Sequence, residues 1–247
     1  MIPIKTPEQI KKISYSGKIL SKLFKILENN IKPGITTEVL NEIAEKYLEK
    51  MGLKPAFKGY RGFPAALCVS VNEEVVHGIP SKRALEEGDI VSIDMGAIHE
   101  GFFSDAARTY PVGQISTLKQ KLIAVTKKSL DIAISNMTET NKLFDISHSI
   151  EEYVENNGFS VVRDFVGHGI GEKIHEDPQI PNFGVPDTGP QLKVGMVFAI
   201  EPMVNTGTYE VEVLSDHWTV VTKDKMPSAH FEDTVAITDK GPVILTR

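Results

Sequence analysis

The sequence predicts an α+β fold in a single domain that spans residues 1–247. Pairs of segments with helical periodicity are followed by groups of short, strand-like segments, and this order occurs twice along the chain. No low-complexity linker divides the 247 residues, of which 41% are hydrophobic. A chain of this composition can bury one substantial core, so we expect one compact unit rather than separate domains.

The first half of the chain opens with two predicted helices. Thr6-Pro7-Glu8-Gln9 combines an N-cap threonine, a proline at the first helical position and a glutamine three residues after the cap. Lys32-Pro33-Gly34 ends this helix, and a second is expected from about residue 37 to residue 51, with Gly52 after it. Strands are expected next, over about residues 66–71, 74–77, 89–95 and 101–111.

The second half repeats this order. Helices are expected over about residues 117–135 and 144–157, and strands from about residue 159 to residue 245. At a constant offset of 106 residues, Tyr47 matches Tyr153 and Gly52 matches Gly158. We therefore expect two similar halves, roughly residues 1–112 and 113–247, with a functional site between them. The alternative is that the same order of elements recurs by chance.

Composition narrows the functional class. The formal net charge is −6, and no block of basic residues marks a nucleic-acid interface. The single cysteine, Cys68, excludes an internal disulfide framework and a Cys-x-x-Cys zinc site. No apolar run approaches the ~18 residues of a membrane span, and residues 1–7 contain no apolar signal core. We expect a cytoplasmic, monomeric protein that binds neither nucleic acid nor a membrane.

Four carboxylates and one histidine lie in apolar, strand-like stretches, where ionisable residues are unusual: Asp94, Asp105, His168, Glu201 and Glu232. A buried charge must be paired or bind a metal, and no lysine or arginine stands directly beside these residues. Oxygen-rich ligation with one imidazole suits manganese, iron, cobalt or zinc. Four carboxylates carry enough negative charge for two divalent metal ions. Such a pair activates water for hydrolysis of an amide or a phosphate ester.

The spacing of the first two acids predicts a hairpin. If His99 and Glu100 form a two-residue turn, Asp94 lies directly opposite Asp105, with Cβ atoms about 4.5–5.5 Å apart. Like charges in this arrangement are destabilising unless a positive charge lies between them. The alternative is a pair of ordinary aspartates at strand ends. The three further ligand candidates downstream favour the metal site.

The ordered set of five ligands resembles that of the type I, bacterial-like methionine aminopeptidases. Gly167-His168-Gly169-Ile170-Gly171, Phe198-Ala199-Ile200-Glu201-Pro202 and His77-Gly78-Ile79-Pro80 extend the likeness, which covers essentially the whole chain. The resemblance implies the pita-bread fold, in which two pseudosymmetric halves of antiparallel strands and helices surround a central metal site. It also implies removal of the N-terminal methionine from nascent proteins and peptides with a small second residue, and a transient association with the ribosome.

The resemblance also implies a role for each ligand. Asp94 would bind one metal ion, His168 and Glu201 would bind the other, and Asp105 and Glu232 would bridge both. A hydroxide between the ions would attack the amide carbonyl of the first residue, and Glu201 would help to move the proton.

Two more histidines and an apolar pocket complete the site that the resemblance implies. His77 and His175 would contact the scissile amide and stabilise the intermediate, although each taken alone reads as an ordinary loop residue. Ile174 stands where phenylalanine is common in the family, and His230 stands where glutamine is common. The pocket for the methionine side chain would be lined by Tyr60, Phe63, Cys68, Ile174 and Trp218.

Two other functions compete with this one. An Xaa-Pro aminopeptidase or prolidase of the same fold commonly carries a separate N-terminal domain, and a first helix at about residue 7 is expected to leave no room for one. A binding module on the same scaffold would have lost its metal ligands, whereas all five ligand types are present here.

Overall fold

Four α-helices form the outer layer of the structure, a computed structural model that describes residues 2–247. They are α1 (Pro7–Asn30), α2 (Thr37–Lys50), α3 (Thr117–Ser135) and α4 (Leu143–Asn156). The predicted start of α1 is confirmed, because the hydroxyl of Thr6 accepts from the backbone N–H of Gln9 and the Gln9 side chain accepts from the N–H of Thr6. Within residues 2–247, no helix combines the length and the apolar character needed to cross a bilayer.

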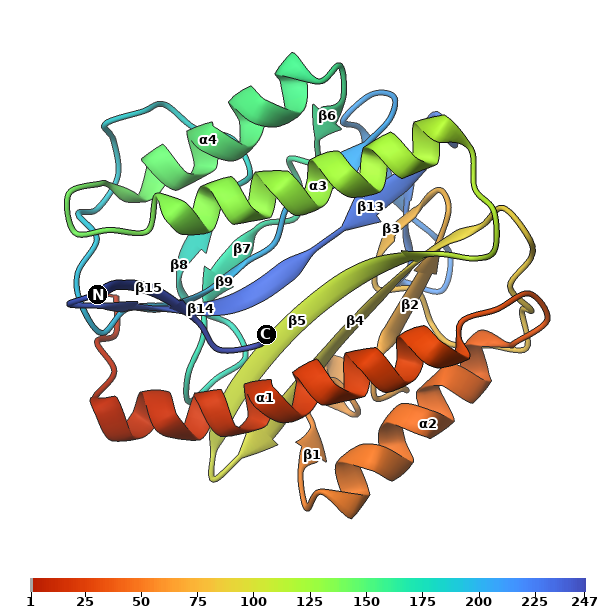
Figure 1. Cartoon of the computed structure of the whole chain (residues 1–247), viewed down its shortest axis with the longest axis horizontal. Coiled ribbons are helices and arrows are strands. Elements are labelled where there is room, and N and C mark those ends of the chain that lie inside the picture. Colours follow the sequence, from red (N-terminus) through yellow and green to blue (C-terminus); the bar gives the residue numbers. More distant parts are fainter. Residues whose placement is uncertain (1) are drawn as a thin grey trace.

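Nine strands form the largest sheet, and every strand pairing in it is antiparallel. These strands are β1 (Lys54–Pro55), β2 (Cys68–Val71), β4 (Ile90–His99), β5 (Phe102–Pro111), β7 (Gly167–Gly169), β8 (Glu176–Ile180), β9 (Val197–Ile200), β14 (Glu232–Thr238) and β15 (Gly241–Ile244). Their order is β1-β4-β5-β14-β9-β7-β8, with β2 paired to β4 and β15 paired to β14. The sheet therefore joins strands from both halves of the chain (Figure 1).

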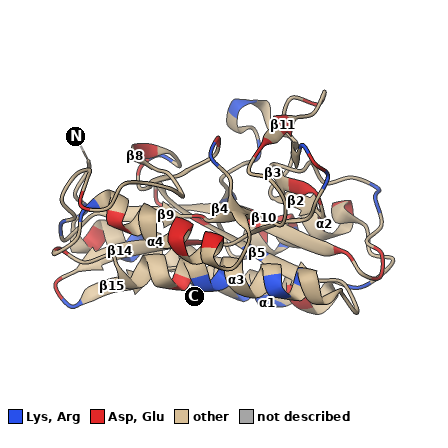
Figure 2. Cartoon of the chain, turned by 90° about the horizontal axis from the view of Figure 1, so that it is seen from above, with Lys and Arg blue, Asp and Glu red and all other residues tan. Residues whose placement is uncertain are grey.

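Two small sheets of three strands each complete the β structure. One contains β6 (Ser160–Val161), β10 (Met203–Asn205) and β13 (Ser228–His230), and the other contains β3 (Glu74–Val76), β11 (Val211–Val213) and β12 (Val220–Thr222). Helices α1 and α3 lie on one face of the large sheet, and the small sheet that contains β3 and β11 lies on the opposite side (Figure 2). One face of the large sheet is thus covered by helices, while the other faces the loops.

Each half of the molecule has its own apolar core. In the first half, α1 and α2 pack against β2 and β4 through buried side chains such as Leu20 and Ile93. In the second half, α3 and α4 pack against β9 and β14 through side chains such as Ile146 and Phe198. This arrangement agrees with the order of elements expected for two similar halves, and the duplication itself stays a prediction.

The hairpin of β4 and β5 turns one residue later than the sequence suggested. Glu100 and Gly101 form the turn, with φ angles of 46° and 81°, and glycine suits the second of these left-handed positions. Asp94 consequently pairs with Ala107, and the expectation that it lies directly opposite Asp105 is wrong. A shift of two residues keeps a side chain on the same face of a strand. The two aspartates are therefore diagonal neighbours on one face.

Candidate active site

The five predicted metal ligands come from five neighbouring strands of the large sheet. Asp94 and Asp105 belong to β4 and β5, Glu232 is the first residue of β14, Glu201 directly follows β9, and His168 is the middle residue of β7. These strands lie side by side in the order β4-β5-β14-β9-β7. Residues up to 138 positions apart, from 94 to 232, are thereby gathered at the centre of the sheet.

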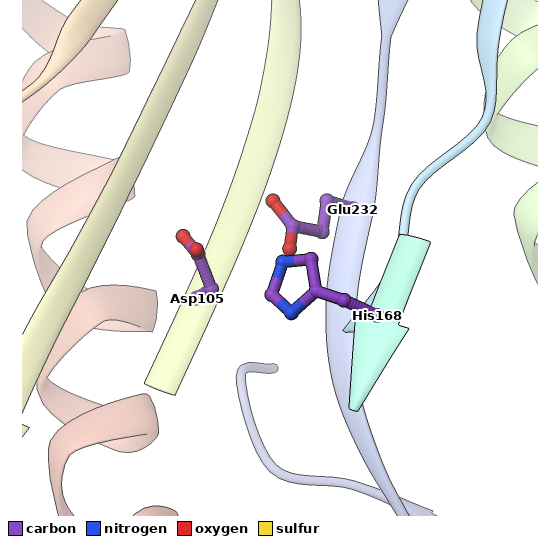
Figure 3. A group of neighbouring side chains, drawn as sticks. All are labelled: Asp105, His168 and Glu232. Atoms are coloured by element: carbon purple, nitrogen blue, oxygen red, sulfur yellow. The ribbon is translucent and has the colours of Figure 1, made fainter. Parts of the chain in front are cut away.

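Three of the ligands converge closely. Asp105, His168 and Glu232 point toward a common space from three different strands (Figure 3). One donor atom of each lies within 4.8 Å of the others, and all three residues are buried. His168 Nδ1 lies 2.9 Å from the carbonyl oxygen of Gly169, which can only accept a hydrogen bond. The proton is therefore on Nδ1, and the lone pair of Nε2 is free to bind a metal.

The carboxylates are electrostatically unfavourable without a cation. Burial and the neighbouring carboxylates raise the pKa of Asp94, Glu201 and Glu232 well above the usual range. Burial raises the pKa of Asp105 to about 7. Asp94 Oδ1 and Glu232 Oε1 are buried and have no hydrogen-bond partner within residues 2–247. Unpartnered oxygen donors next to a free imidazole nitrogen fit a divalent metal ion, and we assign divalent metal binding to this cluster.

His77 and His175 stand beside this cluster in loops. His77 directly follows β3 with a φ of 60°, and its ring lies edge-on to Phe165 at a centroid distance of 5.6 Å. His175 Nδ1 is 3.0 Å from the hydroxyl of Tyr60. Burial lowers the pKa of His77 to about 4, and desolvation also lowers the pKa of His175. Both rings are therefore neutral near pH 7, and each offers one N–H donor and one acceptor nitrogen.

The side chains expected to hold methionine lie together in an apolar corner. The rings of Phe63 and Trp218 meet edge to face at a centroid distance of 5.1 Å. Cys68 and Phe63 are buried, the partly buried Trp218 packs against them, and Ile174 is also buried. Burial and the nearby carboxylates raise the pKa of the Cys68 thiol, so this residue contributes a neutral, polarizable surface. Aromatic, aliphatic and sulfur groups of this kind suit an unbranched thioether.

One cavity of about 880 Å³ contains the whole predicted site. All twelve candidate residues line it: Tyr60, Phe63, Cys68, His77, Asp94, Asp105, His168, Ile174, His175, Glu201, Trp218 and Glu232. The twelve residues thus share one cavity, and their assignment as site residues and their chemical roles stay predictions. His230, which departs from the family pattern, does not line the cavity and is buried.

Several lining residues were missed at the level of sequence. Phe165 lines the cavity and stands two positions before the Gly167-His168-Gly169 segment. Its closeness in sequence to the predicted ligand His168 could have identified it as a lining residue. Pro3 and Glu176 also line the cavity. No local pattern marks these two residues, because they reach the site only through the path of the folded chain.

Comparison with known proteins yields a consistent set of relatives. Residues 11–239 match the model of metallopeptidase family M24. A methionine aminopeptidase from Clostridium perfringens is 55% identical over 246 residues, which cover 100% of this chain and 99% of the relative. The crystal structure of a methionine aminopeptidase from Thermotoga maritima has a TM-score of 0.99 and 48% identity, with 100% of both chains covered. A prolidase from Pyrococcus furiosus has a TM-score of 0.81 and 25% identity, and the match covers 99% of this chain but 65% of the prolidase.

Proposed function

Given that the chain belongs to metallopeptidase family M24 and is a methionine aminopeptidase of the pita-bread fold, we propose that the five ligands at the centre of its sheet hold two divalent metal ions. The observation that carries this proposal is the convergence of Asp105, His168 and Glu232 next to buried carboxylate oxygens that lack a hydrogen-bond partner in the described part of the chain. The activity is the metal-dependent removal of an N-terminal methionine from a peptide.

The order of the strands supports a different metal-binding role for each group of ligands. Asp105 and Glu232 lie on the adjacent strands β5 and β14, between the strand of Asp94 and those next to Glu201 and His168, and would bridge both ions. Asp94, on β4, would bind the ion on one side, while His168 and Glu201 would bind the other. The donors suit manganese, iron, cobalt or zinc. When bound, the ions would act as Lewis acids on the amide carbonyl and lower the pKa of water.

The residues around the ligands would bind and orient the amide. If the Tyr60 hydroxyl donates to His175 Nδ1, then His175 Nε2 carries a proton that it can donate to the carbonyl oxygen. His77, also neutral, would contact the amide from the side of Phe165 and Trp218. Glu201 would accept a proton from the attacking water at its carboxylate and pass it to the leaving nitrogen. The products are then free methionine and a shortened peptide.

The apolar corner would provide the side-chain specificity. Phe63, Cys68, Ile174 and Trp218 would enclose the methionine side chain and exclude water from it. Burial of a chain of this size is favourable by about 1.5–3 kcal/mol, enough to discriminate against small first residues. A preference for small second residues belongs to the same proposal.

Peptide N-termini are the substrate of this activity. We further propose that the substrates are nascent chains in the cytoplasm, that the protein acts as a monomer, and that it associates transiently with the ribosome. Sedimentation of the protein alone and with ribosomes would test the last two points.

Release of free methionine from Met-Ala-Ser tests the proposed reaction directly. Chelated protein would be assayed before and after each of manganese, iron, cobalt and zinc is added back, with Met-Leu-Ser and Ala-Pro-Ser as comparison substrates. We expect cleavage of Met-Ala-Ser that depends on metal, with two ions bound per chain at full activity. Cleavage of Ala-Pro-Ser instead would favour the alternative of an Xaa-Pro aminopeptidase or related prolyl peptidase, and full activity with one ion would overturn the two-metal assignment.

A further inference from the structure

Lys5 is a buried lysine outside the metal cluster. Its side chain is 5% exposed and forms an ion pair with the carboxylate of Glu176, which is 10% exposed. The backbone N–H of Lys5 donates to the carbonyl oxygen of Gly195 at 2.7 Å, so the main chain is held as well. Lysine is rarely buried, because removing an ammonium from water is costly even when it is paired. A buried pair between residues 171 positions apart therefore calls for a functional explanation.

The carboxylate of Glu176 also holds the loop that precedes it. Its Oε1 atom accepts from the backbone N–H groups of Glu172 at 2.7 Å and Lys173 at 3.2 Å, while Oε2 accepts from Lys5. His175 is the residue directly before Glu176. One buried carboxylate thus connects the N-terminal segment to a turn whose last residue is the histidine of the candidate site.

The loop of residues 171–176 approaches Lys5 so closely at Gly171 that no side chain fits between them. A Cβ atom at Gly171 would lie 2.2 Å from Cε of Lys5 and 2.6 Å from its Nζ, so only glycine allows this approach. On the other side, the carbonyl oxygen of Gly171 accepts from the backbone N–H of Phe103 at 2.8 Å. The start of the loop is therefore clamped between Lys5 and strand β5. Pro3, from the same N-terminal segment, lines the active-site cavity.

We propose that Lys5 is a positioning residue that acts through Glu176 to hold His175 in its working orientation. The inference rests on the proposed role of His175 at the scissile amide. Loss of the Lys5 ammonium leaves a buried carboxylate without its counter-ion, and water or movement of residues 171–176 must then solvate it. His175 would lose its fixed position, whereas the metal ligands, which Lys5 does not contact, would keep theirs.

Removal of this constraint should affect turnover more than substrate binding. A misplacement of a catalytic group by about 1 Å can cost about 100-fold in rate. We expect Lys5→Met to lower kcat about 10- to 100-fold for Met-Ala-Ser, because His175 contributes mainly in the transition state. KM should change less than about threefold, since most of the methionine pocket lies outside the loop.

The experiment compares the metal-loaded full chain with Lys5→Met, Glu176→Gln and the double variant. Lys11→Met is the matched control, because the ion pair of Lys11 with Glu8 is exposed. Three quantities are measured: hydrogen exchange of residues 171–176, kcat and KM for Met-Ala-Ser, and bound metal. We expect faster exchange and lower kcat in both single variants, no further loss in the double variant, full metal content throughout, and no change in the control.

Each outcome has a defined meaning. Unchanged hydrogen exchange in Lys5→Met would show that Lys5 does not hold residues 171–176. Faster exchange with unchanged kcat would show that the catalytic role of His175 does not depend on the ordering of this loop. Either result overturns the inference. If Lys5→Met does not fold, Glu176→Gln provides the same comparison, because it keeps an oxygen acceptor for the backbone N–H groups. Failure of the wild type to release methionine would instead overturn the proposed function, while the exchange measurement still tests the clamp.

Discussion

His230 Nε2 lies 3.6 Å from Oε2 of Glu201, although His230 does not itself line the cavity. His230 is 1% exposed, and its Nε2 has no hydrogen-bond partner among the described residues. Burial lowers its pKa to about 3, so the ring is neutral and can carry its proton on Nε2. The other oxygen of Glu201 lies 3.5 Å from Nε2 of His168. Glu201 is therefore held between a metal ligand and a second imidazole, which can donate an N–H much as the more common glutamine would.

Replacing His230 should weaken metal binding even though this residue does not line the cavity. Loss of a residue that orients a metal ligand typically costs about 10–100-fold in affinity. We expect His230→Ala to raise the Kd for manganese by about that factor in calorimetric titrations, and His230→Gln to restore most of the affinity. His148→Gln, on α4, is the control. An unchanged Kd in His230→Ala would mean that Glu201 keeps its orientation without this contact.

Removal of the metal should make thermal stability sensitive to pH above about pH 7. The pKa of Asp105 is raised to about 7 and those of Asp94, Glu201 and Glu232 are raised well above their usual range, so the folded metal-free protein binds protons that the unfolded chain does not. Stability gained in this way is present at low pH and is lost as pH rises through the folded pKa values.

The histidines do not disturb this test. The folded pKa values of the four histidines in and around the site, His77, His168, His175 and His230, are lowered. Their effect on stability is confined to pH values below about 6.5, where the unfolded imidazole is protonated. We expect the Tm of chelated protein to fall between about pH 7 and about pH 9, while the metal-loaded protein changes much less. A flat Tm in the chelated protein, with metal loss confirmed, would contradict the charge-repulsion argument.

The gathering of the five ligands could be predicted from the sequence because each is an ionisable residue in an apolar strand. That pattern is local, and alternation along a strand then decides which face a side chain occupies. The alignment of Asp94 with Asp105 was wrong for an equally local reason. The turn uses Gly101 at a position with positive φ, and the choice between two adjacent two-residue turns moved the pairing by two residues.

The contacts that support the site could not be predicted in this way. Lys5 meets Glu176 across 171 positions of sequence, and His230 reaches Glu201 because β13 pairs with β10, which begins two residues after Glu201. No periodicity or motif encodes such contacts, since they depend on how separate strands and loops pack. The difference explains why ligand identities were accessible from the chain while their positioning partners were not.

Asp105→Asn should abolish turnover while leaving the fold intact. The amide offers a neutral oxygen in place of a charged one, and a bridging ligand would serve both ions. The backbone of Asp105 keeps its hydrogen bonds to the Thr234 hydroxyl at 2.9 and 2.7 Å. We expect kcat for methionine release to fall at least about 100-fold at saturating metal. Glu212→Gln, at an exposed ion pair with Lys225, is the control. Near-normal turnover at full metal loading would count against the bridging role.

Asp233→Ala should destabilise the protein from the face opposite the metal cluster. The Asp233 carboxylate is fully buried and pairs with Arg108 and with Arg247, and it also accepts from the Thr246 hydroxyl at 2.8 Å. Arg108 additionally donates to the backbone carbonyl of Glu232, so this network supports a strand that carries a metal ligand.

Removing one partner of a buried ion pair costs about 3–5 kcal/mol. Because both arginines are partly exposed, we expect the free energy of unfolding in urea to fall by about 3 kcal/mol, with a smaller loss for Asp233→Asn. A loss below about 1 kcal/mol, the range of exposed ion pairs, would show that the network does not anchor β14.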